Sequence, residues 1–503
     1  MKTTINNILE PTLSLGFKTC IIGVPNFDKK VTELTMVKNI ATEKQVNELF
    51  GEDSIVAQMY RNFRKVDVNG EVSMNAILVP DENADLSKAT KHTITLTAGA
   101  ATGDYTVKIV IADRIININV DSGTSVNDVA TAIAAAITTN GLTGYTASAT
   151  TNVVTLTAKS NNAFYDNIVP TVTPSIAAFT SVIATVASTA TVIDMDGIGS
   201  FLDKKNVKHD AFFMESGLSE TALIAKIKEY ETMDDKDMVG SLFTTKFDTY
   251  ANLIDASNAY NALYDTFIGF KANSVQDKVT ARVLQPYEVN AIFVALIALC
   301  MTPNANCSKY LANSPIGSLS NGRLPFAKCA FDFINLVEGT EWENSEFNNL
   351  ENNGVWTAKN NAAENMSIGE ITTTLYLTSE GRPITTFRLG NARLQRNVSL
   401  SMHFSVLQDN FQHRELSEKT ETDVLSTLAT IYKTLSGQVR SSDGSMYYVL
   451  DERGYETYMN SLKNSKLVNY STGTIAFSKA RQTLLAQLEA IIMNIVSQQY
   501  VDA

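Results

Sequence analysis

The segment from Cys20 to Pro80 constrains the fold more than any other part of the chain, because it has the pattern of one strand–helix–helix–strand unit. An apolar run from Cys20 to Val24 predicts a buried strand that leads into a Pro-Asn turn. A second apolar run, Val72 to Val79, predicts another strand that closes the unit before Pro80. Two helices are expected between these strands. Such a unit is typical of layered α/β folds.

Local capping signals fix where the two helices begin and end. Thr42 and Gln45 have the spacing of a capping box, and Gly51 is placed as a C-terminal stop. Ser54 can cap the second helix, which is expected to extend to about Val66. Six apolar residues of that helix fall on one face, which should pack on the sheet: Ile55, Val56, Met59, Tyr60, Phe63 and Val66.

In this order, these residues resemble the start of contractile tail sheath proteins of the Mu-like phage type. In that family a strand, a helix pair with a Leu-Phe-Gly motif and a further strand recur near the N-terminus. The residues of this chain that match are Leu49-Phe50-Gly51, Ser54, Met59 and Phe63. The resemblance implies a structural subunit that stores mechanical free energy in a polymer and catalyses no reaction.

Composition narrows the classes of function. A chain of 503 residues is long enough for two to four domains, and 44% hydrophobic with 19% charged residues is typical of globular proteins. The formal net charge of −12 argues against bulk nucleic-acid binding, which needs a cationic surface. The first residues lack the apolar core of a signal peptide, and the densest apolar run, Val289 to Met301, is too short to span a bilayer. We therefore expect a protein that is cytoplasmic when made.

A change of composition near Lys88 predicts an inserted module. From Thr90 to about Thr191 the chain is rich in Thr, Ala, Val and Asn, with alternating apolar positions typical of half-buried strands. Ser125 is expected to cap a single helix with Val126, Val129, Ile133 and Ile137 on one face. The predicted strands are 92–97, 105–111, 115–120, 145–148 and 153–158. Thr-rich insertions at this point also occur in Mu-like sheath proteins.

After the module, strands and helices alternate again. Strands are expected at 211–214, 239–244 and 266–270, and helices at 219–230, 249–264 and from Pro286. Three further segments resemble the sheath family: Gly240 to Thr245, Glu346 to Val355, and Gly369 to Tyr376, the last as a strand. Beyond Arg396 the match weakens. There the pattern predicts helices at 395–414, 422–435 and 452–462 and a strand at 446–450, while 478–501 suits either type.

The predicted fold class is therefore a multidomain α/β (α+β) protein. It has a layered α/β sheath core with an inserted small Thr-rich β/α domain and extended terminal arms. The expected divisions are an N-terminal arm at 1–19, a core formed by 20–88 and 193–395, an inserted domain at 89–192, and a C-terminal domain with an arm at 396–503.

No pattern recommends a catalytic, cofactor-binding or metal-binding residue, and no cofactor is expected. His92, His209, His403 and His413 lack the spacing of zinc ligands. The run Asp194 to Gly199 fails as a calcium loop because Ile198 and Lys205 stand where oxygen ligands are needed, so a turn is expected. Motifs of serine hydrolases, NTPases and dinucleotide binders are absent. Cys20, Cys300, Cys307 and Cys329 show no CxxC spacing; buried free thiols are the default, and disulfides between subunits remain open.

The resemblance assigns intersubunit contacts to the two ends of the chain. Sheath subunits exchange extended arms that join a neighbour's sheet, and main-chain hydrogen bonds survive rotation of the attached bodies. The residues implied are Thr3, Thr4, Ile5, Asn6, Asn7, Ile8, Leu13, Ile491, Ile492, Ile495, Val496, Tyr500 and Val501. Without the resemblance, frayed termini would be preferred.

The implied partners are other copies of this chain, the tail tube protein, and the baseplate and tail terminator proteins, with no nucleic acid and no membrane insertion. The implied location is the virion tail, assembled in the host cytoplasm. Two alternatives stay open. One is the sheath of a bacteriocin-like or other contractile injection particle. The other, from a different class, is a Thr-rich surface adhesin or binding protein; an enzyme with an unrecognised site ranks behind both.

Overall fold

The computed structural model describes residues 18–81, 85–99, 103–140, 144–190, 192–205, 209, 211–232, 241–262, 265–301, 329–369, 371–377, 381–382, 418–435, 439–440, 446–447, 455–464, 468–469 and 474–475. Within these residues the chain forms a mixed α/β structure with several sheets. The predictions for 395–414, for 478–501 and for both terminal arms lie outside the described residues.

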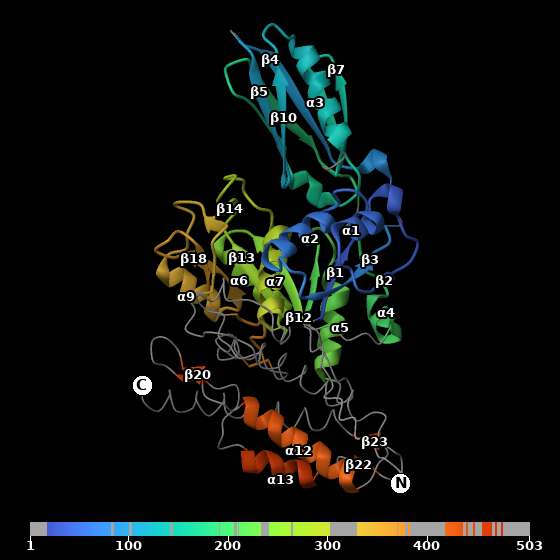
Figure 1. The fold of residues 1–503 in the computed structure, drawn as a ribbon, viewed down its shortest axis with the longest axis vertical. Coiled ribbons are helices and arrows are strands. Elements are labelled where there is room, and N and C mark those ends of the chain that lie inside the picture. Colours follow the sequence, from blue (N-terminus) through green and yellow to red (C-terminus); the bar gives the residue numbers. More distant parts are fainter. Residues whose placement is uncertain are drawn as a thin grey trace, which may run out of the picture.

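A seven-stranded sheet organises the core, in the order β17-β13-β12-β11-β1-β3-β2 (Figure 1). Neighbouring strands are parallel, except that β2 runs antiparallel to β3. The chain passes from β1 to β3 on one side and later returns to place β11 on the other side of β1. The bounds are β1 Lys18–Gly23, β2 Thr35–Val37, β3 Ser73–Leu78, β11 Ala211–Met214, β12 Ser241–Phe247, β13 Asp265–Phe270 and β17 Val355–Trp356.

Helices cover both faces of this sheet. α2 (Ile55–Val66) and α7 (Pro286–Met301) pack against each other and belong to the main hydrophobic core, as does Ile268 of β13. Its neighbour Phe267 points into a separate cluster with α6 (Tyr250–Tyr260) and α9 (Asn344–Asn352). Adjacent strand residues point to opposite faces, so the two clusters lie on opposite sides of the sheet. The other described helices of the core are α1 (Glu43–Phe50), α4 (Ile198–Lys205) and α5 (Thr221–Thr232).

The capping signals read from the sequence are confirmed. Thr42 and Gln45 form the capping box, Gly51 ends α1 with a φ of 91°, and the Ser54 side chain accepts a hydrogen bond from the Ala57 amide. All six apolar residues predicted for the buried face of the second helix are 0–3% exposed. The predicted strand, two helices and strand are therefore confirmed in type and order, and the structure adds the short strand β2 between the first strand and α1.

The inserted domain, by which we mean residues 91–186, forms two antiparallel sheets of its own and stands at one end of the core (Figure 1). One sheet has the order β10-β4-β8-β7 and carries α3 against it; the other has the order β6-β5-β9. The predicted strands and helix are confirmed, and β9 and β10 add to them. The bounds are β4 Lys91–Ala98, β5 Tyr105–Ile111, β6 Arg114–Val120, α3 Val126–Asn140, β7 Tyr145–Thr150, β8 Val153–Ala158, β9 Thr171–Pro174 and β10 Phe179–Val186.

Smaller elements complete the described chain. Short 3-10 helices are η1 (Phe27–Lys29), η2 (Leu86–Lys88) and η3 (Ala163–Asn167). α12 (Glu418–Leu435) packs on α13 (Tyr455–Asn464), which confirms two predicted helices. Short strands pair as β14 (Val275–Asp277) with β16 (Ile334–Leu336), and β19 (Met366–Ile368) pairs with both β15 (Ala330–Phe331) and β18 (Ala358–Asn360). Two further pairs are β20 (Val439–Arg440) with β21 (Met446–Tyr447), and β22 (Val468–Asn469) with β23 (Thr474–Ile475).

Two sequence predictions are wrong in detail. The strand expected from Gly369 to Tyr376 does not form a ladder within its described residues: β19 ends at Ile368, and the Thr374 amide instead donates to the Asp265 carbonyl over 3.1 Å. The helix expected to reach Tyr264 ends at Tyr260, because Asn261 takes the left-handed conformation. The Asn261 side chain then accepts from the Tyr376 amide over 2.9 Å, so the helix end holds the segment that was expected to pair as a strand.

The long apolar helix is buried rather than exposed to lipid. The described side chains of α7 from Val289 to Leu299 are at most 3% exposed. Within the described segments, no helix combines the length and apolarity needed to cross a bilayer.

Candidate functional site: the joint between the inserted domain and the core

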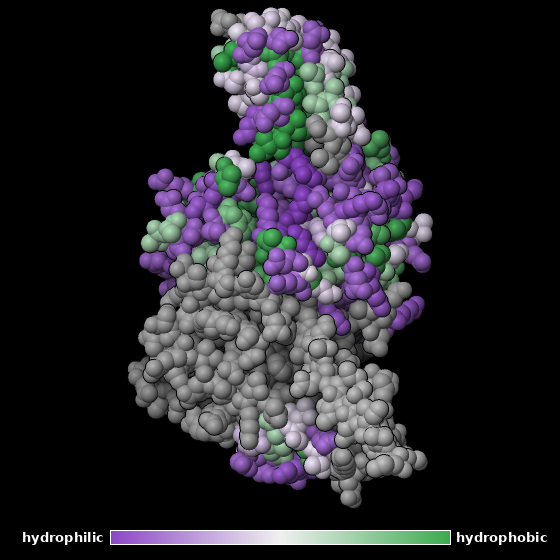
Figure 2. Space-filling model, in the orientation of Figure 1, coloured by the Kyte–Doolittle hydropathy of each residue, from purple (hydrophilic) through white to green (hydrophobic). Residues whose placement is uncertain are grey.

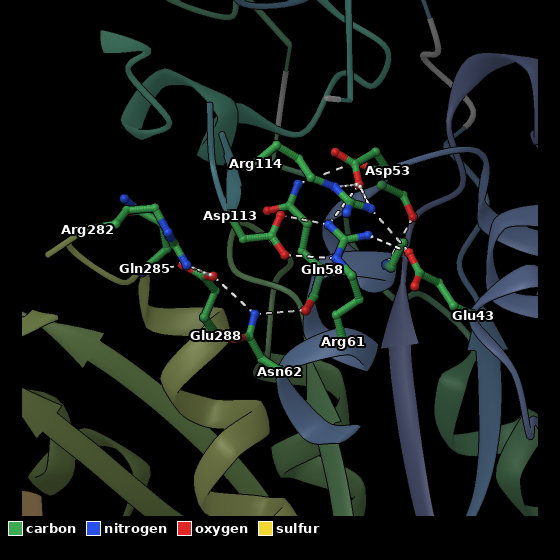
Figure 3. A network of polar contacts seen from close by, with 12 residues as sticks. Glu43, Asp53, Gln58, Arg61, Asn62, Asp113, Arg114, Arg282, Gln285 and Glu288 are labelled. Carbon is green, nitrogen blue, oxygen red and sulfur yellow. Dashed lines mark hydrogen bonds and ion pairs between the residues drawn. The ribbon is translucent and has the colours of Figure 1, made fainter. Parts of the chain in front are cut away.

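The tip of the β5–β6 hairpin carries charge into the boundary between the inserted domain and the core. The turn passes through Ala112, with a φ of 50°, and places Asp113 against α2. Arg61 of α2 meets Asp113 in a two-pronged contact, with Nε 2.8 Å from Oδ2 and Nη2 2.7 Å from Oδ1 (Figure 3). Paired guanidinium–carboxylate bonds of this kind fix orientation as well as distance.

Asp53 lies at the centre of this cluster. Its side chain is fully buried, and Oδ1 is 2.7 Å from Nη2 of Arg61 and 3.2 Å from Nε and Nη2 of Arg114. Glu43 closes the cluster, because its Oε1 lies 2.9 Å from Arg61 and 3.2 Å from Arg114. Two arginines, one from the core and one from the inserted domain, are thus shared among three carboxylates.

Burial sets the protonation of these carboxylates. It raises the pKa of Asp53 to about 6, and the charges of Arg61 and Arg114 oppose that rise. Burial also disfavours the charge of Asp113, but the bond and charge of Arg61 hold the pKa of that carboxyl below its usual range. Of these two carboxyls, Asp53 therefore protonates before Asp113 as the solution becomes acidic, and Asp113 keeps its negative charge to lower pH.

A second set of contacts ties α2 to the start of α7. The Glu288 carboxylate accepts hydrogen bonds from both Nη atoms of Arg282, over 2.8 and 2.7 Å. It also accepts one from the backbone N–H of Gln285 over 2.8 Å. The Asn62 amide donates to the same carboxylate over 3.0 Å, and the Tyr287 hydroxyl donates to Gln58. Gln58 and the side-chain nitrogen of Asn62 therefore have partners in the interior, where both residues are fully buried, whereas Oδ1 of Asn62 has none among the described residues.

A third contact fills the end of the parallel sheet. Asn162 of the inserted domain donates from Nδ2 to Oε1 of Glu215 over 2.9 Å and to the Ser216 carbonyl over 2.8 Å. Glu215 follows β11 directly and is 2% exposed. Gly217 has a φ of 95°, and a Cβ there would lie 2.0 Å from Oδ1 of Asn162. Only glycine fits this approach.

This contact occupies the position where the strand order of the core reverses, between the carboxyl ends of β1 and β11. In open α/β sheets, ligands commonly bind in that crevice. Here side chains of the inserted domain lie in it, since Phe164 also packs edge-on against Tyr287 with ring centres 5.6 Å apart. A cavity of about 490 Å³ remains beside it, lined by Phe164 and Asn167 of the inserted domain and by core residues that include Glu215, Lys246 and Asn290.

Glu215 makes the stability of the joint decrease as the pH rises toward about 8. Burial raises its pKa from 4.5 to about 8, against the hydrogen bonds from Asn162 and the Val24 amide. The folded protein therefore holds this proton more tightly than the unfolded chain. The stabilisation it gives is complete below pH 4.5 and is lost as the pH rises through about 8.

We expect the free energy of unfolding to fall by up to about 1.4 kcal/mol per pH unit between about pH 6.5 and 8 because of this group. Urea unfolding at several pH values measures it. Glu215→Gln should remove that part of the slope, whatever its effect at a single pH, whereas Glu48→Gln at an exposed site should keep it. An unchanged slope in Glu215→Gln would contradict the assignment.

The candidate site residues taken from the sequence are not brought together by the described structure. Thr3 to Ile8, Leu13 and Ile491 to Val501 lie outside it, as do His403, His413 and Cys307.

His92 is buried and bonded to Thr185 and the Tyr165 carbonyl, and His209 contacts Asn75, so both have structural roles. Cys20 and Cys329 are buried and form no disulfide among the described residues, as expected by default. Within the run Asp194 to Gly199, Asp196 and Gly197 form the predicted turn, and α4 begins at Ile198. In the part of the chain that the structure describes, no cluster of His, Cys, Asp or Glu is arranged to hold a metal ion.

The residues of the joint were missed at the sequence level. Two signals could have indicated them. Arg61 lies between Gln58 and Asn62 on a helix whose other face is apolar, and Asp113 with Arg114 forms a charged pair at the tip of a hairpin in a module with few charges. Neither signal indicates which residue is the partner, because Arg61 and Asp113 are 52 residues apart and Arg114 and Asp53 are 61 residues apart in the chain.

Comparison with known proteins gives similarity to solved structures only; no family model matches this chain and no curated protein sequence matches it significantly. A sheath tail protein from Desulfitobacterium hafniense is similar with 10% identity and a TM-score of 0.43, over 89% of this chain and 97% of that chain. The sheath complex of an extracellular contractile injection system, in its contracted state, gives 8% identity and a TM-score of 0.37 over 86% and 82%. The baseplate of the anti-feeding prophage gives 12% identity and a TM-score of 0.31 over 50% and 63%. By their names, two of these three solved structures are a sheath tail protein and a sheath complex, and the third is a baseplate.

Proposed function

We propose that this chain is the structural subunit of a contractile tail sheath, which polymerises helically around a tail tube and shortens to drive the tube through the host envelope. The observation that carries the proposal is the unit from Cys20 to Pro80. Each residue of its sheath-like motif has a physical task in the structure. No catalytic step is part of the proposed function.

The residues that match the sheath motif pack the helix pair against the sheet. Phe50 and Met59 are fully buried, and Phe63 stacks on Phe213 of β11 with ring centres 5.7 Å apart. Gly51 needs its positive φ, and a Cβ there would lie 2.6 Å from Cβ of Asn26. The Leu-Phe-Gly motif therefore specifies how the helix pair sits on the sheet, which is the property that a sequence resemblance to the sheath family would preserve.

The joint supports the proposed mechanism. Contraction is a transition between two lattices of nearly rigid subunits, with the extended form held on the tube and the contracted form lower in free energy. A buried ion network, together with a backbone hydrogen bond of 2.9 Å from Phe27 to the Lys159 carbonyl, fastens the inserted domain to the core. Each subunit can then move as one body.

We further propose that the ends of the chain link the subunits by strand addition. The residues concerned are Thr3 to Ile8 and Leu13 in the N-terminal arm and Ile491, Ile492, Ile495, Val496, Tyr500 and Val501 in the C-terminal arm. Pairing with a different surface of the next copy gives an open helical polymer when the rotation between successive copies does not close into a ring. The tube, baseplate and terminator proteins complete the proposed set of partners, in a tail assembled in the host cytoplasm.

Negative-stain microscopy of the purified chain tests the proposal, since sheath subunits assemble into wide tubes or striated cylinders. Removal of Met1 to Leu13 should leave the core folded but abolish tubes of normal length. Ile5→Pro with Ile8→Pro should act in the same way because proline cannot complete a strand ladder. The matched control, Ile5→Val with Ile8→Val, keeps strand propensity and should assemble normally. Sheaths of normal length that contract despite the deletion would refute the arm assignment.

The sheath of a bacteriocin-like or other injection particle stays within the same proposal, because the subunit would be built alike. The adhesin alternative finds less support. Aromatic rings that commonly form sugar-binding platforms are covered in the inserted domain: Tyr105, Tyr145, Tyr165 and Phe179 are at most 7% exposed, and Phe164 packs on Tyr287.

A further inference from the structure

The edge of the inserted domain carries a strand without the usual protection against pairing. β10 lies at the end of the sheet β10-β4-β8-β7 and, among the described strands, pairs only with β4. Its eight residues, Phe179 to Val186, include no charge, proline or glycine. Natural edge strands commonly carry lysine, proline or a bulge to prevent pairing with another chain.

The C-terminal half of this strand is mostly apolar and largely exposed. Val182 and Val186 are 65% and 58% exposed, and Ala184 lies between them on the same face. Figure 2 shows hydrophobic residues gathered on the near side of the inserted domain, where β10 runs in Figure 1. The first half differs, because Phe179 is buried and the Ser181 hydroxyl donates to the Val172 carbonyl over 3.1 Å. The free edge is therefore residues 182–186.

The charge of the inserted domain and the exposure of its aromatic rings limit which kinds of molecule can bind at this strand edge. Residues 90–190 carry four Lys or Arg against five Asp and no Glu, so the domain is close to neutral within a chain of net charge −12. A nucleic acid would need a cationic surface, and a sugar would lack an exposed aromatic ring. Another copy of a neutral domain meets little electrostatic repulsion, and its own strand edges supply the missing hydrogen-bonding groups.

We propose that residues 182–186 of β10 pair with an edge strand in the inserted domain of a second copy of this chain. This inference rests on the proposed function, which places copies side by side in a polymer. If β10 of one copy pairs with a different edge strand of the next copy, such as β6 or β7, each pair of copies still has one unpaired strand of each kind. Further copies can then add in the same way along the lattice. The inserted domains then form a continuous outer layer that adds to the contacts of the arms.

Lysine on the free edge tests the inference in the full-length chain. Val182→Lys with Val186→Lys places two like charges at the contact without disturbing the core, because both side chains are exposed. We expect the subunit concentration at which assembly begins to rise tenfold or more, measured by sedimentation velocity and negative-stain microscopy. Asn127→Lys with Ala135→Lys, at exposed positions on α3, adds the same charge and should assemble as the unmodified chain does.

Thermal melting must show both variants folded alike. Equal assembly of the two variants would overturn the inference, even if tubes form and the proposed function stands. If no tubes form but small oligomers persist and disappear only in the β10 variant, the inference stands and the sheath function fails. Oligomers confined to two-fold dimers would contradict the extending form of the contact.

Discussion

Replacing Arg61 by methionine is expected to lower the apparent free energy of unfolding by about 3–5 kcal/mol. The guanidinium is 12% exposed and lies 2.7 Å from both Asp53 and Asp113, whose side chains are 0% and 7% exposed. Without it, two buried carboxylates lose their main counter-charge. A buried charge left without a partner costs more than the pair contributes, because it has already lost its hydration.

Urea unfolding followed by circular dichroism measures the loss. Lys44→Ala is the matched control, since Lys44 and Glu48 form an exposed ion pair of 3.9 Å with side chains 86% and 62% exposed. Such surface pairs contribute about 0–1 kcal/mol. A loss in Arg61→Met no larger than in this control would show that water reaches the cluster and that the joint is not a buried network.

A compensating variant separates lost charge from lost packing. Arg61→Met combined with Asp53→Asn and Asp113→Asn removes both charges that would otherwise stay buried without a partner. It should recover a large part of the stability, as replacement of buried ion pairs by neutral groups commonly does. If the triple variant is no more stable than Arg61→Met alone, steric packing rather than charge accounts for the loss.

The core could be predicted from the sequence because its signals are local. The capping box of Thr42 and Gln45, the stop at Gly51 and the apolar face of α2 each lie within a few turns of helix, and each is confirmed. The alternation in residues 92–97 likewise predicted β4 and its buried face, with His92, Ile94 and Leu96 fully buried. Period and capping act over short distances, so one sequence carries them in full.

The joint could not be predicted, because it depends on pairs that the fold brings together from far apart. Asn162 and Glu215 are 53 residues apart, and Asn62 and Glu288 are 226 apart. Each polar residue on its own is typical of a solvated surface. The prediction for the segment after Ile368 was wrong for the same reason. Its resemblance to a sheath-family segment implied a strand, but the side chain of Asn261 and the carbonyl of Asp265, both distant in the sequence, accept hydrogen bonds from its amides.

The second large effect is expected at Gly217, where alanine should loosen the inserted domain from the core. The residue has a φ of 95°, and its added Cβ would lie 2.0 Å from Oδ1 of Asn162. Positive φ alone costs about 1–2 kcal/mol for a residue with a Cβ. Displacement of Asn162 adds the loss of two hydrogen bonds, at about 0.5–1.5 kcal/mol each, and leaves Glu215 buried without its amide donor.

Gly197→Ala isolates the backbone part of that cost, since Gly197 has a φ of 78° and a Cβ added there would meet no described atom within 4 Å. We expect Gly217→Ala to be destabilised by at least about 2 kcal/mol more than this control. Hydrogen exchange should also become faster around Asn162 and Phe164 in Gly217→Ala only. Equal losses in the two variants would mean that the side chain of Asn162 does not hold the crevice.

A double-mutant cycle identifies the contact itself. Asn162→Ala removes the atom that the new Cβ would strike, so Gly217→Ala should cost only its backbone strain in that background, about 1–2 kcal/mol. The difference between the two backgrounds measures how strongly Asn162 and Gly217 are coupled. Additive effects would place the clash elsewhere. A coupling of about 2 kcal/mol would establish that the inserted domain occupies, through Asn162, the crevice where comparable α/β sheets bind a separate ligand.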